Sequence, residues 1–390
     1  MYKIEEYDYV IVGAGIAGCS LSHFLNKYSD SVLLIDKNQD VAFGASGAAG
    51  AFLSPLLGKP NSFKNLITKA LKFSVEFYRK NYPEEITNCG TCRIPKNNED
   101  REKFLSYIPY MDFDFKEYED GYFFEIGSVV NPYNICKKLS ANVEKILNFD
   151  VNQIENIDGF WLINKKIKAK KLFLTTGADV SLIDEKYFNI RAVWGQKIDI
   201  HSTTCIDINY HKECSLSKST TLSDINKNLI SIGATHNRFT KDMTESSYDL
   251  KLTNINKIKH NDYTQNIIQN DIEKLLSLAN DIKKLENVEV VDVKIGARAS
   301  SVDYFPMVGK LIDSKKSFEK FPHLKNGTHI KNENLEMIEN LYVINGVGGR
   351  GFVLSLYLAN ELVENIFNNT VIEEEITNYR LFKRWAKKSK

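Results

Sequence analysis

The chain opens with two short apolar runs that flank a glycine-rich turn and a helical pattern. The apolar runs are 7–12 and 31–35, and the turn reads Gly13-Ala-Gly15-Ile-Ala-Gly18. Asp36 follows directly on the second run. Strand, tight turn, helix, strand and acid in this order are the fingerprint of a dinucleotide-binding unit. We therefore expect an α/β protein with a Rossmann-like nucleotide-binding domain.

Each part of this fingerprint has a physical task. Gly13 permits a sharp turn, Gly15 lets the backbone approach a pyrophosphate, and Gly18 lets the helix pack closely on the strand. The N-terminus of the helix adds unpaired N–H groups and about half a positive charge, which suit phosphate groups. Asp36 is expected to accept hydrogen bonds from a ribose hydroxyl. The predicted contacts in this unit are Gly13, Gly15, Ile16, Ala17, Gly18, Asp36 and Lys37.

Composition narrows the class of protein. The chain has 390 residues, 43% of them hydrophobic, and a net charge of +1, so it can build a large core but carries no overall basic charge for nucleic acid. The six cysteines follow no regular spacing, and Cys89-Gly-Thr-Cys92 alone makes neither a zinc site nor a thioredoxin motif. With no signal-peptide core or membrane-length apolar run, we expect a cytoplasmic protein without metal.

Two further small-residue turns follow apolar runs later in the chain. One is Thr176-Gly177-Ala178, and the other is the stretch 346–351, which precedes a helical pattern over 352–367. A nicotinamide dehydrogenase needs only the first turn, whereas a flavoprotein with one Rossmann-like domain uses all three. FAD is therefore the predicted cofactor, with the last helix directed at the flavin ring. Its further predicted contacts are Ala45, Ser46, Gly47, Thr176, Gly177, Gly346, Gly348, Gly349 and Gly351.

Nucleotide-fold signals stand at both ends of the sequence, and mixed strand patterns stand between them. We expect helices over 62–82 and 132–147, a strand pair over 150–163, and a mostly helical stretch over 243–285. The predicted FAD-binding domain is thus discontinuous, comprising 1–80, 137–189, 290–312 and 335–378. The predicted substrate domain comprises 81–136, 190–289 and 313–334, and 379–390 forms a basic C-terminal tail.

Several of these motifs resemble the D-amino-acid oxidase/glycine oxidase superfamily of flavoproteins. The runs 44–57 and 296–309 are similar to the FAD-dependent oxidoreductase half of the bifunctional tRNA 5-methylaminomethyl-2-thiouridine biosynthesis proteins. So are Gly195-Gln196, 232–235 and Gly349-Arg350-Gly351. The resemblance implies a mixed-sheet substrate domain of the D-amino-acid oxidase type. The chain would be a stand-alone oxidoreductase half, with a separate methyltransferase as a candidate partner.

The same resemblance implies a reaction and its residues. The family removes the carboxymethyl group from 5-carboxymethylaminomethyl-uridine at the wobble position of tRNA, which leaves 5-aminomethyl-uridine. That substrate is an N-substituted glycine, so its carboxylate needs a fixed cation, and arginine binds a carboxylate bidentately. Arg298 and Arg350 match the positions where the superfamily places such arginines. They are the predicted catalytic residues, with tRNA as the predicted partner.

Other interpretations stay open at this point. The chain could oxidise free glycine, sarcosine or D-amino acids, or it could be a non-catalytic flavin-bearing scaffold that binds tRNA. In a chain of low net charge, tRNA would need a local basic surface. Lysines in 165–171 and the tail 379–390 are the two candidates, and Phe382 and Trp385 in the tail suggest base stacking.

Overall fold

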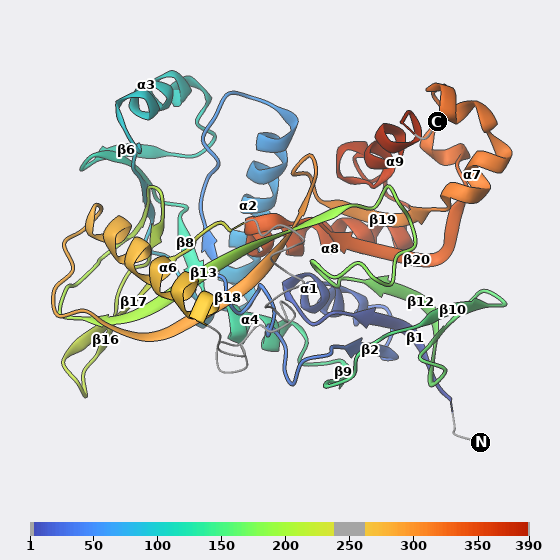
Figure 1. Ribbon diagram of the computed structural model, residues 1–390, viewed down its shortest axis with the longest axis horizontal. Coiled ribbons are helices and arrows are strands. Elements are labelled where there is room, and N and C mark those ends of the chain that lie inside the picture. The colour runs from blue at the N-terminus through green and yellow to red at the C-terminus, as the bar shows by residue number, and fades with distance from the viewer. Residues whose placement is uncertain (1–3, 238–261, 389–390) are drawn as a thin grey trace.

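A largely parallel sheet forms the half of the molecule that carries both chain ends (Figure 1). The computed structural model describes residues 4–237 and 262–388. In the sheet, β1 pairs in parallel with β12 on one side and with β2 on the other. The strands, in spatial order, are β10 (Ile154–Ile157), β11 (Phe160–Ile163), β12 (Ile167–Leu174), β1 (Glu5–Val12), β2 (Val32–Ile35) and β9 (Glu144–Ile146), while β20 (Met337–Asn345) joins β12 and β19 (Met307–Ile312) joins β20.

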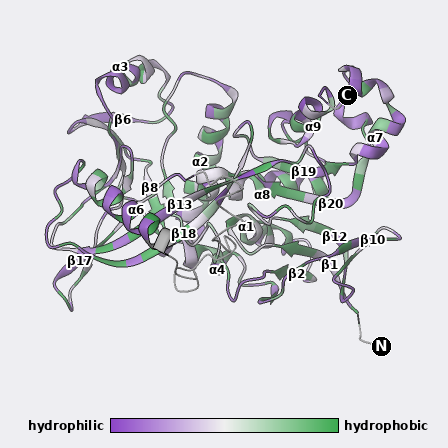
Figure 2. Cartoon of the chain, viewed as in Figure 1, coloured by the Kyte–Doolittle hydropathy of each residue, from purple (hydrophilic) through white to green (hydrophobic). Residues whose placement is uncertain are grey.

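Both faces of this sheet are buried, as the alternation of side chains along β1 requires. Tyr9 and Ile11 lie in a core cluster with the helices on one face, and Val10 and Val12 lie in a second cluster on the other. Figure 2 shows the strands of this sheet as predominantly hydrophobic. The helices of the first face are α1 (Ile16–Leu25), α2 (Ser62–Asn81), α4 (Pro132–Leu139) and α8 (Gly351–Asn368).

A second, mixed sheet lies beside the first and is covered by α6 (Asp262–Asn280), whose Leu275 and Ala279 are fully buried against it. Its two longest strands, β13 and β18, pair in antiparallel register over their whole length. The strands, in spatial order, are β18 (Glu289–Ser301), β13 (Ile190–Ser202), β17 (Lys227–Gly233), β15 (Ser215–Leu216), β14 (Asn209–His211), β5 (Thr91–Arg93), β7 (Gly121–Phe124) and β6 (Phe115–Tyr118), with β16 (Thr220–Leu222) on β17.

Smaller elements complete the described part of the chain. A third, separate sheet consists of short strands, in the order β3 (Phe52–Leu53), β8 (Ser128–Val130) and β4 (Ile86–Thr87). The remaining α-helices are α3 (Asn98–Tyr107), α7 (Ser314–Lys320) and α9 (Tyr379–Ala386). The short 3-10 helices are η1 (Pro83–Glu85), η2 (Ile108–Tyr110), η4 (Pro322–Asn326), η5 (Asn332–Asn334), η6 (Gly348–Arg350) and η7 (Glu374–Ile376). None of the described helices is long and apolar enough to cross a bilayer.

Most of the expected elements are present, and one is shorter than expected. The helix expected over 132–147 ends at Leu139, and β9 follows instead. The reason is tertiary: β9 pairs in parallel with β2 and extends the sheet, which a continued helix could not do. The first part of the stretch expected to be helical, 243–261, lies outside the described residues.

Three segments do not pack with the domain to which the expected boundaries assign them. Residues 290–301 belong to β18 of the mixed sheet, because β18 pairs with β13. In 313–334, Phe318 and Leu324 pack into the core beneath the parallel sheet, not into the mixed sheet. Helix α4 packs on α1. The predicted tail is also not a free terminus, because its helix α9 buries Phe382 completely in the core beneath the parallel sheet.

Candidate functional site

A large cavity lies between the carboxyl ends of the parallel strands and the long strands β13 and β18. Its volume is about 980 Å³. This is at the upper end of the range of about 300–1,000 Å³ that is typical of small-molecule sites, and large enough for an extended ligand. Its position at the carboxyl edge of the sheet is where open α/β folds bind dinucleotides.

The fingerprint turn forms one end of the cavity, and two of its glycines are required by close packing. Gly13 has a φ of +110°, and a Cβ there would lie 2.5 Å from the carbonyl oxygen of Thr175. A Cβ on Gly18 would lie 1.9 Å from the carbonyl oxygen of Gly13. Only glycine permits this path, which brings the N-terminus of α1 to the cavity wall. Gly18 itself is not part of that wall.

The loop 44–50 passes over the start of α1. The N–H of Ile16 donates to the hydroxyl oxygen of Ser46 at 2.9 Å, and Gly15, the residue before the helix, offers no side chain for this purpose. Ser46, which is distant in sequence, therefore caps the helix. Both Ser46 and Ala45 line the cavity. Gly47 is needed for the turn, because a Cβ there would lie 2.1 Å from the carbonyl oxygen of Ala42.

Asp36 lies at the end of β2 and fixes the fingerprint turn. One carboxylate oxygen accepts from the N–H of Ala14 at 2.6 Å, and the other accepts from the backbone and side chain of Asn38, each at 2.8 Å. The neighbouring Lys37 forms an ion pair with Asp179 at 3.0 Å. Both Asp36 and Lys37 line the cavity.

The other two small-residue turns meet the fingerprint across the cavity. Gly177 has a φ of +65°, and its carbonyl oxygen accepts from the side chain of Asn345 at 2.9 Å, which ties the second turn to the third. In the third turn Gly346 and Gly348 have φ values of +74° and +55°. A Cβ on Gly351, where α8 begins, would lie 3.0 Å from the side chain of Ile16. The first turns of α1 and α8 are therefore in contact.

The structure thus brings together most of the residues predicted to bind the cofactor. Three of them, Gly18, Gly47 and Gly346, lie outside the cavity wall and shape the backbone behind it. Those that form the wall are Gly13, Gly15, Ile16, Ala17, Asp36, Lys37, Ala45, Ser46, Thr176, Gly177, Gly348, Gly349 and Gly351.

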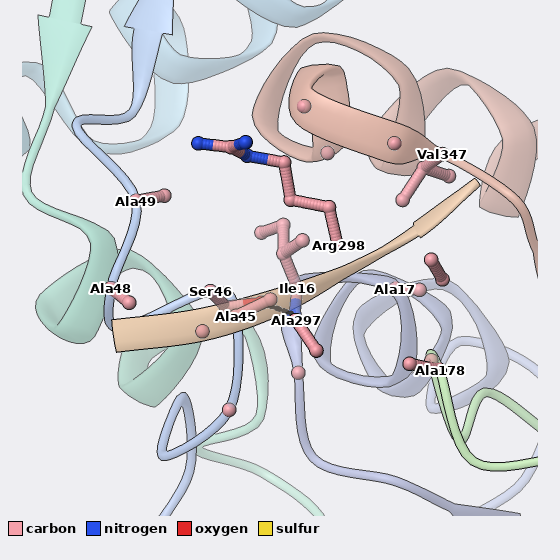
Figure 3. Close-up of a pocket in the computed structure, with 18 of the residues that line it drawn as sticks. Ile16, Ala17, Ala45, Ser46, Ala48, Ala49, Ala178, Ala297, Arg298 and Val347 are labelled. Carbon is pink, nitrogen blue, oxygen red and sulfur yellow. Dashed lines mark hydrogen bonds between the residues drawn. The ribbon is translucent and has the colours of Figure 1, made fainter. Parts of the chain in front are cut away.

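Arg298 projects from β18 into the cavity. Figure 3 shows its guanidinium on the same side as Ala49 and directed away from Ala17 and Ala178. One nitrogen donates to the carbonyl oxygen of Thr235 at 3.1 Å, and no carboxylate pairs with Arg298 within 4–237 and 262–388. Burial lowers the pKa of this guanidinium. A half-buried cation with no carboxylate beside it among the described residues has the chemistry to bind an anion.

Arg350 also lines the cavity and likewise has no described carboxylate partner. Its one hydrogen bond is weak, to the carbonyl oxygen of Ser54 at 3.4 Å. Burial lowers the pKa of Arg350 to about 10, which still leaves it protonated at neutral pH. Both predicted catalytic arginines therefore present free N–H donors to the same cavity.

A third half-buried arginine, Arg93, was not predicted. It donates to the carbonyl oxygen of Pro55 at 3.2 Å, while its buried Nε has no hydrogen-bond partner in the structure. Burial, and secondly the charge of Arg350, lower the pKa of Arg93 to about 9. Arg93 lies beside His211 because β5 pairs with β14, a parallel pairing that no sequence spacing indicates. Burial and these two arginines hold the pKa of His211 well below its usual value, so His211 is neutral.

Other polar, aromatic and thiol side chains lie in or near the site. His236 and Tyr304 both line the cavity, and burial, followed by the charge of Arg298, lowers the pKa of His236. Phe305 instead packs against the core. Cys89 and Cys92 are free thiols, and burial raises the pKa of both, that of Cys92 to about 12. Neither is therefore an activated nucleophile.

Comparison with known proteins agrees with this geometry. The chain is 24% identical over 409 residues to the "tRNA 5-methylaminomethyl-2-thiouridine biosynthesis bifunctional protein MnmC" of Campylobacter hominis, a match that covers 92% of this chain and 60% of that protein. A protein of the same name from Leptospira interrogans is 26% identical over 402 residues, with 93% of this chain and 58% of that protein covered. The chain thus spans no more than about 60% of the length of these curated relatives.

Solved structures share the fold at low sequence identity. Glycine oxidase from Bacillus cereus superposes with a TM-score of 0.68 at 16% identity, covering 94% of this chain and 96% of that one. The L-alpha-glycerophosphate oxidase of Mycoplasma pneumoniae, solved with FAD bound, has a TM-score of 0.66 at 15% identity, covering 96% of this chain and 98% of that one. The sequence profile of the family described as "FAD dependent oxidoreductase" matches residues 8–365. The chain therefore belongs to this DAO family of FAD-dependent oxidoreductases.

Proposed function

We propose that this flavoenzyme removes the carboxymethyl group from 5-carboxymethylaminomethyl-uridine at the wobble position of tRNA. Hydride leaves the methylene of the substrate, and water hydrolyses the resulting imine to 5-aminomethyl-uridine and glyoxylate. Molecular oxygen, the proposed final electron acceptor, is reduced to hydrogen peroxide. The observation that carries the proposal is the pair of arginines in the cavity, Arg298 and Arg350, for which the described residues supply no carboxylate. The similarity to tRNA-modifying relatives along 92–93% of the chain supports tRNA as the substrate.

The chain offers a suitable cradle for FAD. A side chain at Gly13 or Gly18 would collide with neighbouring backbone, so glycine at both positions lets the turn bring the N-terminus of α1 to the cavity wall. In this arrangement the N–H groups at the start of α1 and the hydroxyl of Ser46 would hold the pyrophosphate. Asp36 would accept from the ribose, and the turn 346–351 would face the ring system. FAD, when bound, supplies the acceptor for the hydride that leaves the substrate.

The arginines then have a positioning task. A guanidinium that binds the substrate carboxylate bidentately fixes the adjacent methylene in one orientation. Arg298 is the proposed carboxylate ligand, because it points into the cavity from a rigid strand and makes only one hydrogen bond of its own. We propose Arg350 as a second donor to the same anion. His211 is neutral and therefore does not compete with the two arginines for the substrate carboxylate.

Oxidation of free small amines is the second candidate, because the structure resembles glycine oxidase as a fold. Anaerobic flavin reduction separates the two functions. We expect tRNA carrying the modified uridine to bleach the flavin absorbance much faster than millimolar glycine or sarcosine does. The control is the same tRNA without the modification, which should leave the flavin oxidised. Rapid bleaching by free glycine, with no response to modified tRNA, would contradict the proposal.

Tight binding of tRNA without any flavin reduction would instead favour a non-catalytic scaffold.

A further inference from the structure

The segments 313–334 and 379–388 are far apart in sequence but form one basic surface at the edge of the molecule (Figure 1). Together they contain ten lysines and arginines against three acidic residues, in a chain whose net charge is only +1. Helices α7 and α9 lie side by side, since the ring of Phe318 is 6.0 Å from that of Phe382 and 5.5 Å from that of Trp385. Lys315, Lys316 and Lys320 of α7 and Arg384 of α9 are exposed.

Basic side chains lie where the two segments contact each other. A Cβ on Gly327, which ends η4, would lie 3.7 Å from the side chain of Lys387, so this lysine passes over η4. Lys325 of η4 lies 5.3 Å over the ring of Phe318. On the other side, Arg384 and Lys388 are one helical turn apart and both exposed. Cations from both segments therefore gather around the junction of η4 and α9.

Most of these charges are not neutralised by the protein. Lys316, Lys320, Lys331 and Arg380 each pair with a carboxylate. No ion pair is found within the described ranges for the remaining six, which are Lys315, Lys325, Lys383, Arg384, Lys387 and Lys388. Unpaired like charges held close together repel one another, and a polyanion would relieve that repulsion.

The other basic run of the sequence is different. In 165–171, Lys168 pairs with Glu6 at 3.3 Å and Lys170 pairs with Asp8 at 2.7 Å. These lysines lie along β12 within the parallel sheet, where acidic residues of β1 face them. Within the described ranges, three lysines of 165–171 are thus left without an ion pair, against six cations on the surface of α7, η4 and α9, which is therefore the stronger candidate.

We propose that Lys325, Arg384, Lys387 and Lys388 contact the phosphate backbone of the tRNA substrate. This inference rests on the proposed function for the identity of the RNA. It assigns the contact to a structured surface and not to a flexible tail, because α9 is anchored by buried Tyr379, Leu381 and Phe382. The stacking of Phe382 on a base, which the sequence suggested, is wrong because this ring is fully buried.

The test is the salt dependence of tRNA binding, measured by fluorescence anisotropy with the flavin-loaded full chain. The logarithm of the binding constant falls linearly with the logarithm of the salt concentration, and each phosphate contact makes this slope steeper by about 0.9. The triple variant Lys325→Gln/Arg384→Gln/Lys387→Gln should therefore lose about 2 to 3 from the slope and bind at least about tenfold more weakly near physiological salt. The matched control is Lys165→Gln/Lys166→Gln, which changes two exposed lysines of the other run and should leave the slope unchanged.

Flavin content and the melting temperature report whether each variant is folded. A folded triple variant with an unchanged slope would overturn the inference, whether or not the enzyme acts on tRNA. A wild-type protein without measurable affinity for tRNA would overturn it as well. Loss of slope in the variant, together with no release of the carboxymethyl group by the wild type, would support the surface while refuting the proposed reaction.

Discussion

At the scale of single residues, Arg298 carries most of the chemical argument. Arg298 is half-buried, makes one hydrogen bond to a described backbone carbonyl oxygen, and has no described counter-ion. Arg298→Ala should lower kcat/KM for modified tRNA by at least about a hundredfold, since leaving a buried carboxylate unpaired costs about 3–5 kcal/mol. The measurement is steady-state oxidation at several tRNA concentrations.

Arg79→Ala, at an exposed position at the end of α2, is the matched control and should retain the wild-type rate. A loss smaller than about fivefold in Arg298→Ala, with flavin still bound, would exclude Arg298 as the carboxylate ligand.

Glycines give a second prediction at this scale. Gly18→Ala places a Cβ 1.9 Å from the carbonyl oxygen of Gly13, and neither backbone segment can move without opening the fingerprint turn. We expect a loss of at least about 1–3 kcal/mol in the free energy of unfolding, together with reduced flavin content. Gly44→Ala is the control, because a Cβ at Gly44 would meet no atom within 4 Å. Equal melting temperatures for the two variants would contradict this role for Gly18.

At the scale of elements, the contact between α1 and α2 should make stability depend on pH. His23 of α1 packs edge-on against Phe77 of α2, with ring centroids 5.2 Å apart. Burial, and secondly the charge of Lys27, lower the pKa of His23 to about 4. Because the unfolded chain takes up this proton below about pH 6.5 and the folded chain does not, the contribution of His23 to stability falls as the pH drops from about 6.5 to 4.

His23→Gln removes this titration. The difference in unfolding free energy between wild type and variant should shrink on acidification, by up to about 1 kcal/mol per pH unit, since the ring retains part of its hydration. Urea unfolding at pH 7.5, 6.5 and 5.5 provides the comparison. A difference that stays constant across these pH values would mean that His23 titrates alike in both states.

Elements also show what sequence can and cannot predict here. The βαβ unit, α2, the hairpin of β10 and β11, and α8 follow from apolar periodicity and glycine turns, which are local signals. The helix expected to reach residue 147 stops at Leu139 because pairing of β9 with β2 decides the local structure. Arg93 lies beside His211, which lines the cavity, through the pairing of β5 with β14, and this contact has no local signal. Both features depend on tertiary pairing, which periodicity does not encode.

At the scale of the whole molecule, the two large sheets border the cavity, and a separate basic surface lies at the edge of the fold. The three glycine turns could be predicted because each stands directly after an apolar strand, whereas the DAO-type fold was predicted from the resemblance of several motifs to that family. The expected domain boundaries were less informative, because β18 joins the mixed sheet while β19, which follows it, joins the parallel sheet. Because β18 belongs to the mixed sheet and borders the cavity, Arg298 enters the cavity from the mixed sheet.

The central claim is that the cavity holds an N-substituted glycine that is part of tRNA. Mass spectrometry of wobble nucleosides, from tRNA incubated aerobically with the flavin-loaded enzyme, tests this most directly. We predict that 5-carboxymethylaminomethyl-uridine is replaced by 5-aminomethyl-uridine, with glyoxylate formed in equal amount, and that Arg298→Ala leaves the starting nucleoside in place. An unchanged wobble nucleoside after incubation with active, flavin-loaded wild-type protein would contradict the account.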